Sequence, residues 1–265
     1  MPTQQTEPVA INRWPQTASD QQPIASKGGD SHKSRISRYN GSIRVAITVQ
    51  VINGDQKGSG IIIRDKQKRL WIITNRHVVG ESSDVCIAFS DGRDATGSVF
   101  QSEYTDDDIA FISVAQLRKD EPYAVPDYQL DSASVNPVVA TGYRADTDAY
   151  LETPGVTVPI LKGKILGSGY SLTYSNQVEK GMSGGGIFSD NDRLIGINAL
   201  HSDPLWPGDW HDSNGRRLKG GLGRKLDSVS VGIAIENIYS ALNHIKRKGT
   251  TKPATATCPL KAKNP

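Results

Sequence analysis

The stretch GSGIIIRDKQKRLWIITNRHVVG, residues 58–80, decides the fold of this chain. It contains two short apolar runs, GSGIIIR (58–64) and RLWIITN (69–75), separated by a polar turn that begins at Asp65. Runs of this length, rich in β-branched residues and bounded by turn residues, are typical of β-strands. The stretch therefore predicts two neighbouring strands, with His77 directly after the second of them.

Similar runs recur at short intervals in both halves of the chain. The first half adds SIRVAITVQVI (42–52), DVCIAFS (84–90), ATGSVFQ (95–101) and DIAFISV (108–114). After a connector over roughly 118–136, the second half contains PVVATGY (137–143), VTVPILKGKILG (156–167), YSLTYS (170–175), GGIFS (185–189), RLIGINAL (193–200) and VSVGIAI (229–235). Short strands about 8–12 residues apart predict an all-β barrel or sandwich. Two groups of six predict two antiparallel six-stranded β-barrels, over about 42–117 and about 136–235.

The segments around the barrels differ in composition. ENIYSALNHIKRK (236–248) spaces its apolar residues as a helix does, so a C-terminal helix is expected to close a domain over 39–248. Residues 1–38 are rich in Gln, Ser, Thr and Pro, which predicts a flexible leader, and 249–265 are predicted to form a disordered tail.

One long polar segment, residues 201–228, interrupts the second barrel and predicts a surface loop. It is rich in glycine and carries Trp206 and Trp210. Loops longer than about 12–15 residues are usually functional or disordered. Two interpretations stay open: the tryptophans recognise a substrate or partner peptide, or they fold back onto the second barrel and hold the loop there.

Composition excludes several classes of protein. The chain has 265 residues, with 31 Lys and Arg against 28 Asp and Glu, a net charge of +3. No run approaches the ~20 apolar residues of a membrane-spanning helix, and so small a charge gives no reason to expect nucleic-acid binding. The start lacks a signal-peptide pattern. The protein is expected in the cytoplasm if Met1 is the native start, and outside it if a signal segment was removed.

The two cysteines, Cys86 and Cys258, lie far apart in the sequence. Cys86 belongs to an apolar run, whereas Cys258 belongs to the predicted tail. Two distant cysteines argue against a disulfide framework, and against a zinc site that needs four closely spaced ligands. The sequence therefore predicts one buried thiol, one exposed thiol and no metal.

Three motifs occur in order along the chain: TNRHVVG with His77, DDDIAF with Asp108 and GMSGGG with Ser183. Each motif alone is weak, but together they fit nucleophilic acyl transfer. A serine hydroxyl is a poor nucleophile until a base accepts its proton, and imidazole suits that role. The imidazole in turn needs an acceptor on its other nitrogen, which a buried carboxylate supplies.

The glycines around Ser183 have an expected mechanical role. A tight loop over Gly181–Ser183 would let the N–H groups of Gly181 and Ser183 converge on the oxyanion of a tetrahedral intermediate, forming an oxyanion hole. Gly184 and Gly185 carry no side chain, so we expect them to let a substrate backbone approach closely.

The three motifs resemble those of chymotrypsin-like (trypsin-fold) serine proteases over roughly residues 42–245. The resemblance is strongest to disulfide-free bacterial members, including the trypsin-like peptidase domains of cyanobacteria. It implies His77 as general base, Asp108 as the carboxylate that orients it, and Ser183 as nucleophile. Asp106 and Asp107 compete for the orienting role, but only Asp108 directly precedes the Ile-Ala-apolar step of the family's motif.

One departure from that family concerns the residue before the nucleophile. Vertebrate digestive members have Asp there, which pairs with a newly freed N-terminal amine, whereas this chain has Met182. Activation by insertion of a new N-terminus is therefore not expected.

The specificity pocket is the least determined part of the prediction. Asn198, Ala199, Leu200 and His201 are the candidate wall, with residues 175–177 opposite. No Asp is placed to attract Lys or Arg. His201 would pair with an acidic substrate side chain, or it is an ordinary loop histidine.

The sequence thus predicts a serine endopeptidase that acts through an acyl-enzyme on a peptide or protein substrate, without metal or organic cofactor. Two alternatives stay open. One is a catalytically silent protease-fold binding module, and the other is a regulatory protease dedicated to one partner protein.

Overall fold

The computed structural model describes residues 42–102, 107–130, 134–201, 209–218 and 221–247, together with Cys258. The predicted leader, Asp106, Trp206 and all of the predicted tail except Cys258 lie outside these residues. Within the described part, no helix is long and apolar enough to cross a membrane, and no cluster of three or more potential metal ligands occurs.

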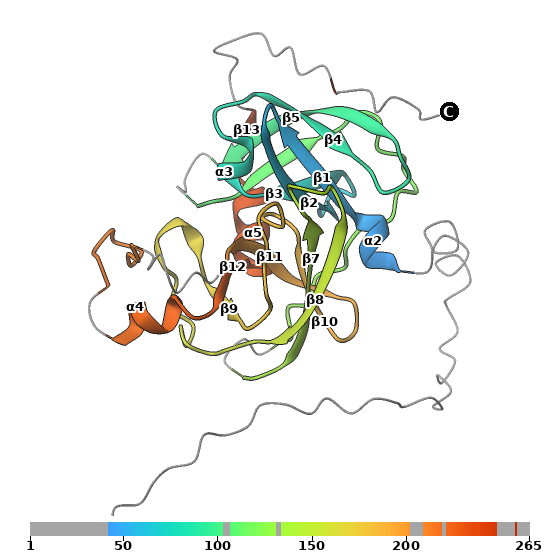
Figure 1. Cartoon of the computed structure of the whole chain (residues 1–265). Coiled ribbons are helices and arrows are strands. Elements are labelled where there is room, and N and C mark those ends of the chain that lie inside the picture. Colours follow the sequence, from blue (N-terminus) through green and yellow to red (C-terminus); the bar gives the residue numbers. More distant parts are fainter. Residues whose placement is uncertain are drawn as a thin grey trace, which may run out of the picture.

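The first of two antiparallel sheets is a closed barrel (Figure 1). It contains β1 (Thr48–Asn53), β2 (Gln56–Arg64), β3 (Leu70–Thr74), β4 (Asp84–Ala88), β5 (Asp94–Ser102) and β6 (Ala110–Ser113). The strands follow the order β5-β4-β1-β2-β3-β6, and pairing of β5 with β6 closes the ring. A short strand, β13 (Ile245–Arg247), adds to β5 from the C-terminal end of the chain.

The second sheet also has six strands, and the two sheets form separate lobes in Figure 1. It contains β7 (Pro137–Tyr143), β8 (Tyr150–Val156), β9 (Leu172–Tyr174), β10 (Gly186–Ser189), β11 (Leu194–Leu200) and β12 (Ser230–Ala234). Their order is β8-β7-β10-β11-β12-β9, and a bridge between Thr157 and Tyr174 joins the two edges. The predicted fold class, two six-stranded antiparallel barrels, is confirmed.

The first predicted strand, over 42–52, is wrong in its first half. Ile43–Ile47 forms a short helix, α2, and β1 begins only at Thr48. Residues four apart share one face of a helix, so Ile43 and Ile47 both pack against the central apolar cluster. On the polar side, Arg44 Nη2 lies 2.9 Å from Glu152 Oε2 in the second barrel. These tertiary contacts outweigh the β-branched composition of the segment.

The strand predicted over 156–167 is also wrong. Backbone in the left-handed region at Lys162 (φ 49°) and Gly163 (φ 79°) turns the chain there. Besides β10, β7 pairs with β8, a strand that sequence reasoning missed because Pro154 and Gly155 weaken its pattern. Proline cannot donate a ladder hydrogen bond, but β8 is an edge strand, where that loss is tolerated.

The C-terminal helix is shorter than the predicted 236–248. Helix α5 covers Ile235–Leu242, and the chain then turns so that Ile245–Arg247 can pair with β5. The segment 201–228 is likewise not all loop. His211 and Arg217 pair in an isolated bridge, and Gly221–Leu226 forms helix α4.

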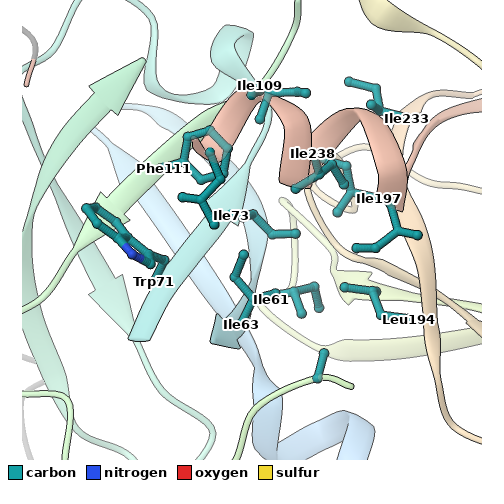
Figure 2. Close-up of a cluster of buried hydrophobic side chains, with 14 of the residues drawn as sticks. Ile61, Ile63, Trp71, Ile73, Ile109, Phe111, Leu194, Ile197, Ile233 and Ile238 are labelled. Carbon is teal, nitrogen blue, oxygen red and sulfur yellow. The ribbon is translucent and has the colours of Figure 1, made fainter. Parts of the chain in front are cut away.

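A single apolar cluster joins the two barrels and α5 (Figure 2). Ile61, Ile63 and Ile73 enter it from the first barrel, and Ile197 and Ile233 enter it from the second; all five are fully buried. Burial of one such side chain stabilises a fold by about 1.5–3 kcal/mol. The shared cluster therefore fixes how the barrels face each other, and with that the relative position of His77 and Ser183.

The prediction of one buried and one exposed free thiol is wrong. Cys86 on β4 and Cys258 form a disulfide with their Cα atoms 5.2 Å apart, so neither thiol is free. No local pattern indicates this pairing, because 172 positions separate the two residues. Only the fold brings Cys258 beside the first barrel, and the resemblance to disulfide-free proteases misleads at this point.

Loss of the disulfide is expected to destabilise the protein. Cys258→Ser should lower the free energy of unfolding by about 2–5 kcal/mol, because the bond restricts the unfolded chain. Urea unfolding of wild type and variant measures the difference, with reduced wild type as the control. Equal stability of both proteins, together with two alkylatable thiols in the native wild type, would contradict the assignment.

Candidate active site

His77 and Asp108 are in direct contact at one end of the first barrel. The His77 ring Nδ1 lies 2.7 Å from Asp108 Oδ2, and the backbone N–H of His77 donates to Asp108 Oδ1 at 2.9 Å. The Asp108 side chain is 8% exposed, whereas that of His77 is 46% exposed. Because a carboxylate only accepts, Nδ1 carries the proton of this hydrogen bond, and Nε2 is the ring nitrogen that Asp108 does not contact.

Strand pairing explains why these two residues meet. Strands β3 and β6 are antiparallel neighbours, with Thr74 opposite Ala110. His77 follows the end of β3 on the short helix α3 (Arg76–Val79), and Asp108 precedes the start of β6. Both motifs therefore emerge at the same end of the barrel. Asn75 adds a further tie, since its Nδ2 donates to the Asp108 carbonyl at 3.0 Å.

Ser183 lies on the loop that precedes β10 in the second barrel, and it lines the same cavity as His77. Its Oγ donates to the Ala199 carbonyl at 3.3 Å. First-barrel residue Ser59 holds the loop from the other side: its N–H donates to the Ser183 carbonyl and its Oγ to the Gly181 carbonyl, both at 2.8 Å. The loop that carries Ser183 is thus held between the two barrels.

The hydrogen bonds of two neighbouring carbonyls orient the N–H groups of Gly181 and Ser183. In a trans peptide the C=O and the N–H point in opposite directions. The Lys180 carbonyl accepts from Ala145 N–H at 2.9 Å, and the Met182 carbonyl accepts from Asn198 Nδ2 at 3.2 Å. Among the described residues neither the Gly181 nor the Ser183 N–H has a protein acceptor. Both donors of the expected oxyanion hole are therefore available.

The neighbouring glycines Gly184 and Gly185 allow segments of the protein itself to pack closely. A Cβ on Gly184 would lie 2.2 Å from the Ser59 carbonyl oxygen, and one on Gly185 would lie 2.0 Å from that of Thr141. Gly184 also has a φ of +83°, which disfavours any other residue. The close approach seen here is that of the protein's own strands β2 and β7.

Three of the four predicted specificity residues line the cavity that His77 and Ser183 share, whose volume is about 550 Å³. Ala199, Leu200 and His201 contribute to its wall, together with residues 178–180, whereas the wall does not include residues 175–177. Asn198 does not line it, because its side chain is fully buried. Charges of both signs surround the opening; Asp55, Lys57, Asp146, Glu179 and Lys180 all line it.

A smaller cavity of about 330 Å³ adjoins the 550 Å³ cavity through Leu200 and His201, which line both. Trp210 forms part of its wall and packs against the apolar cluster below it, which contains Leu166 and Leu226. The indole N–H donates to Asp227 Oδ1 at 2.8 Å. Trp210 thus folds back onto the second barrel, which agrees with the second of the two interpretations of the loop. Part of its side chain still lines the cavity.

Comparison with known proteins gives a consistent family assignment. A family model described as "Trypsin-like peptidase domain" matches residues 58–197, a range that includes His77, Asp108 and Ser183. The Serine protease Do-like HtrA of Bacillus subtilis (strain 168) is 24% identical over 152 residues. That match covers 54% of this chain and 33% of the relative, so this chain spans about a third of the relative's length.

Solved structures agree on the fold. Rv3671c from M. tuberculosis H37Rv in an inactive form is 18% identical, with 88% of this chain and 98% of that chain covered and a TM-score of 0.54. A serine endoprotease from Yersinia pestis is 17% identical, with 84% and 67% covered and a TM-score of 0.53.

Proposed function

We propose that this chain, which belongs to the trypsin-like peptidase domain family of serine endopeptidases, cleaves peptide bonds through an acyl-enzyme formed on Ser183. The observation that carries the proposal is the short contact between His77 Nδ1 and Asp108 Oδ2, 2.7 Å, beside a cavity that His77 and Ser183 line together. This arrangement supports His77 as base, Asp108 as orienting carboxylate and Ser183 as nucleophile in acyl transfer.

In the first step, Ser183 Oγ turns from the Ala199 carbonyl toward His77 Nε2, a rotation about a single side-chain bond. Nε2 takes the hydroxyl proton while Oγ forms a bond to the substrate carbonyl carbon. Hydrogen bonds between nucleophile and base are often loose before substrate binds, so the resting bond to Ala199 is compatible with this role. Asp108 keeps Nδ1 protonated and stabilises the imidazolium.

In the second step, the tetrahedral intermediate collapses. Its oxyanion accepts hydrogen bonds from the N–H groups of Gly181 and Ser183, and the imidazolium of His77 gives its proton to the leaving amine. The C–N bond breaks and an ester remains on Ser183. Water, deprotonated by His77, then releases the acid product and restores the hydroxyl.

The cavity wall indicates which substrate side chains fit best. Val178 and Ala199 are apolar and nearly buried, and they line the same cavity as Ser183. A small apolar side chain on the acyl side of the cleaved bond is the complement of that surface.

Hydrolysis of an unfolded protein such as reduced, alkylated casein tests the proposal, with Ser183→Ala as the control. Cleavage by wild type that is absent in the variant is the expected result. Binding of casein without cleavage by either protein would instead indicate a protease-fold binding module, which no contact in the site favours.

Asn198→Ala is expected to lower kcat by up to about 10²-fold, the effect of losing one oxyanion donor. Without the Asn198 amide, the Met182 carbonyl keeps only the hydrogen bond from the Gly185 N–H, and the Ser183 N–H is less firmly oriented. Asn176→Ala is the matched control, because Asn176 is equally buried and donates to the carbonyl of Val138, away from the nucleophile. Equal kcat losses in both variants would mean that Asn198 has only a structural role.

The disulfide bears on where the protein works. Such bonds form and persist in oxidising compartments. The Cys86–Cys258 bond therefore supports the exported location of the two that the sequence left open.

A further inference from the structure

Asp108 receives a hydrogen bond from the second barrel that the three motifs do not account for. Tyr170 lies just before β9, and its hydroxyl donates to Asp108 Oδ2 at 3.1 Å. The same oxygen faces His77 Nδ1 at 2.7 Å. Asp108 and His77 both belong to the first barrel, so the hydroxyl of Tyr170 reaches across the interface between the barrels to the acidic member of the site.

The backbone turn that carries Tyr170 also holds Asp108. The Asp108 N–H donates to the Ser168 carbonyl at 2.9 Å. Ser168 has a φ of +62° and Gly169 one of +78°, and a Cβ on Gly169 would lie 2.8 Å from the Asp107 carboxylate. A non-glycine residue in the left-handed region persists only where surrounding contacts impose it, and such residues cluster at functional sites.

Hydrogen bonds from helix α5 and to the 209–218 segment hold this turn in place. Gly167 N–H donates to the His211 carbonyl at 3.0 Å. Asn237 Nδ2, on α5, donates to the Gly169 carbonyl at 3.3 Å. The turn is therefore anchored to both α5 and the 209–218 segment, and its position relative to Asp108 follows from the docking of the two barrels.

Tyr170 is suited to donate at every pH at which a histidine base works. Burial raises the pKa of the Tyr170 hydroxyl, and the negative charge of Asp108 beside it raises that pKa further. The hydroxyl thus stays protonated. Its ring also forms a wall of the 330 Å³ cavity with Leu200 and Trp210, so the hydrogen bond lies behind a partly apolar surface.

We propose that Tyr170 is a positioning residue for catalysis: its hydroxyl, supplied by the second barrel, fixes the Asp108 carboxylate so that Oδ2 accepts from His77 Nδ1. The inference rests on the proposed function, since it assigns a task to the same site. Two donors share Oδ2, so removal of the Tyr170 hydroxyl has two consequences. Asp108 becomes freer to rotate, and Oδ2 becomes a stronger acceptor for the His77 proton.

Tyr170→Phe tests the proposal because it removes the hydroxyl and keeps the ring. We expect kcat to fall on the order of tenfold, the scale of one hydrogen bond to a charged group, with KM within about twofold of wild type. The proton NMR resonance of His77 Nδ1–H should move downfield. Tyr239→Phe is the matched control. The Tyr239 hydroxyl also reaches the first barrel, but it donates to the Arg64 carbonyl at the end of β2 and not to Asp108.

The outcomes separate this inference from the proposed function. An unchanged kcat and an unmoved Nδ1–H resonance in Tyr170→Phe would overturn the role of Tyr170. An equal loss of kcat in Tyr239→Phe would overturn it as well, because both changes would then act through stability. Failure of the wild type to cleave any protein would refute the proposed function, and the NMR comparison would still decide whether Tyr170 holds Asp108.

Discussion

Ser183→Ala is expected to lower kcat for peptide hydrolysis on the order of 10⁶-fold, the size of effect seen when a triad nucleophile is removed. The alanine cannot form the acyl-enzyme, so only the oxyanion hole and substrate binding remain. The melting temperature should change little, because the Ser183 hydroxyl makes one long hydrogen bond, to the Ala199 carbonyl.

Ser189→Ala is the matched control for that experiment. Ser189 lies six residues further along the same loop and strand, is more deeply buried, and donates to Asp127 Oδ2. It should keep wild-type kcat. Retention of more than about a hundredth of the wild-type kcat by Ser183→Ala would mean that another group is the nucleophile.

Asp108→Asn is expected to lower kcat by about 10⁴-fold. The two side chains have nearly the same shape, so the loop should keep its fold. An amide that presents its N–H₂ to His77 Nδ1 stabilises the tautomer with the proton on Nε2, and that tautomer cannot accept the Ser183 proton. Active-site titration followed by kcat measurement separates this effect from a loss of folded protein.

Asp107→Asn distinguishes the two neighbouring carboxylates. Asp107 precedes Asp108 and lies against Gly169, not against the imidazole. Its replacement should cost less than about tenfold in kcat. A large loss from Asp107→Asn together with normal activity of Asp108→Asn would show that the wrong carboxylate has been assigned.

Most of the barrel architecture was predictable because its signals are local. Strands such as β2, β3 and β11 show continuous apolar runs bounded by turn residues, and the histidine, aspartate and serine motifs each occupy a few consecutive positions. The contact of His77 with Asp108 could be anticipated as well, since antiparallel neighbours such as β3 and β6 bring their connecting ends together.

The features that sequence reasoning missed depend on contacts between distant segments. Strand β8 contains Pro154 and is acceptable only because it lies at a sheet edge, and helix α2 forms because its apolar face meets the interface cluster. The Cys86–Cys258 bond and the hydroxyl of Tyr170 on Asp108 also join segments far apart in the chain. No local pattern encodes such pairs.

Labelling with a fluorophosphonate probe, followed by peptide mapping with mass spectrometry, tests the central claim most directly. The probe reacts with a serine hydroxyl only when a neighbouring base and an oxyanion hole activate it. We predict one phosphonate per chain, on the peptide that contains Ser183, and none on the Ser183→Ala variant. A phosphonate on any other residue, or equal labelling of the variant, would contradict the account.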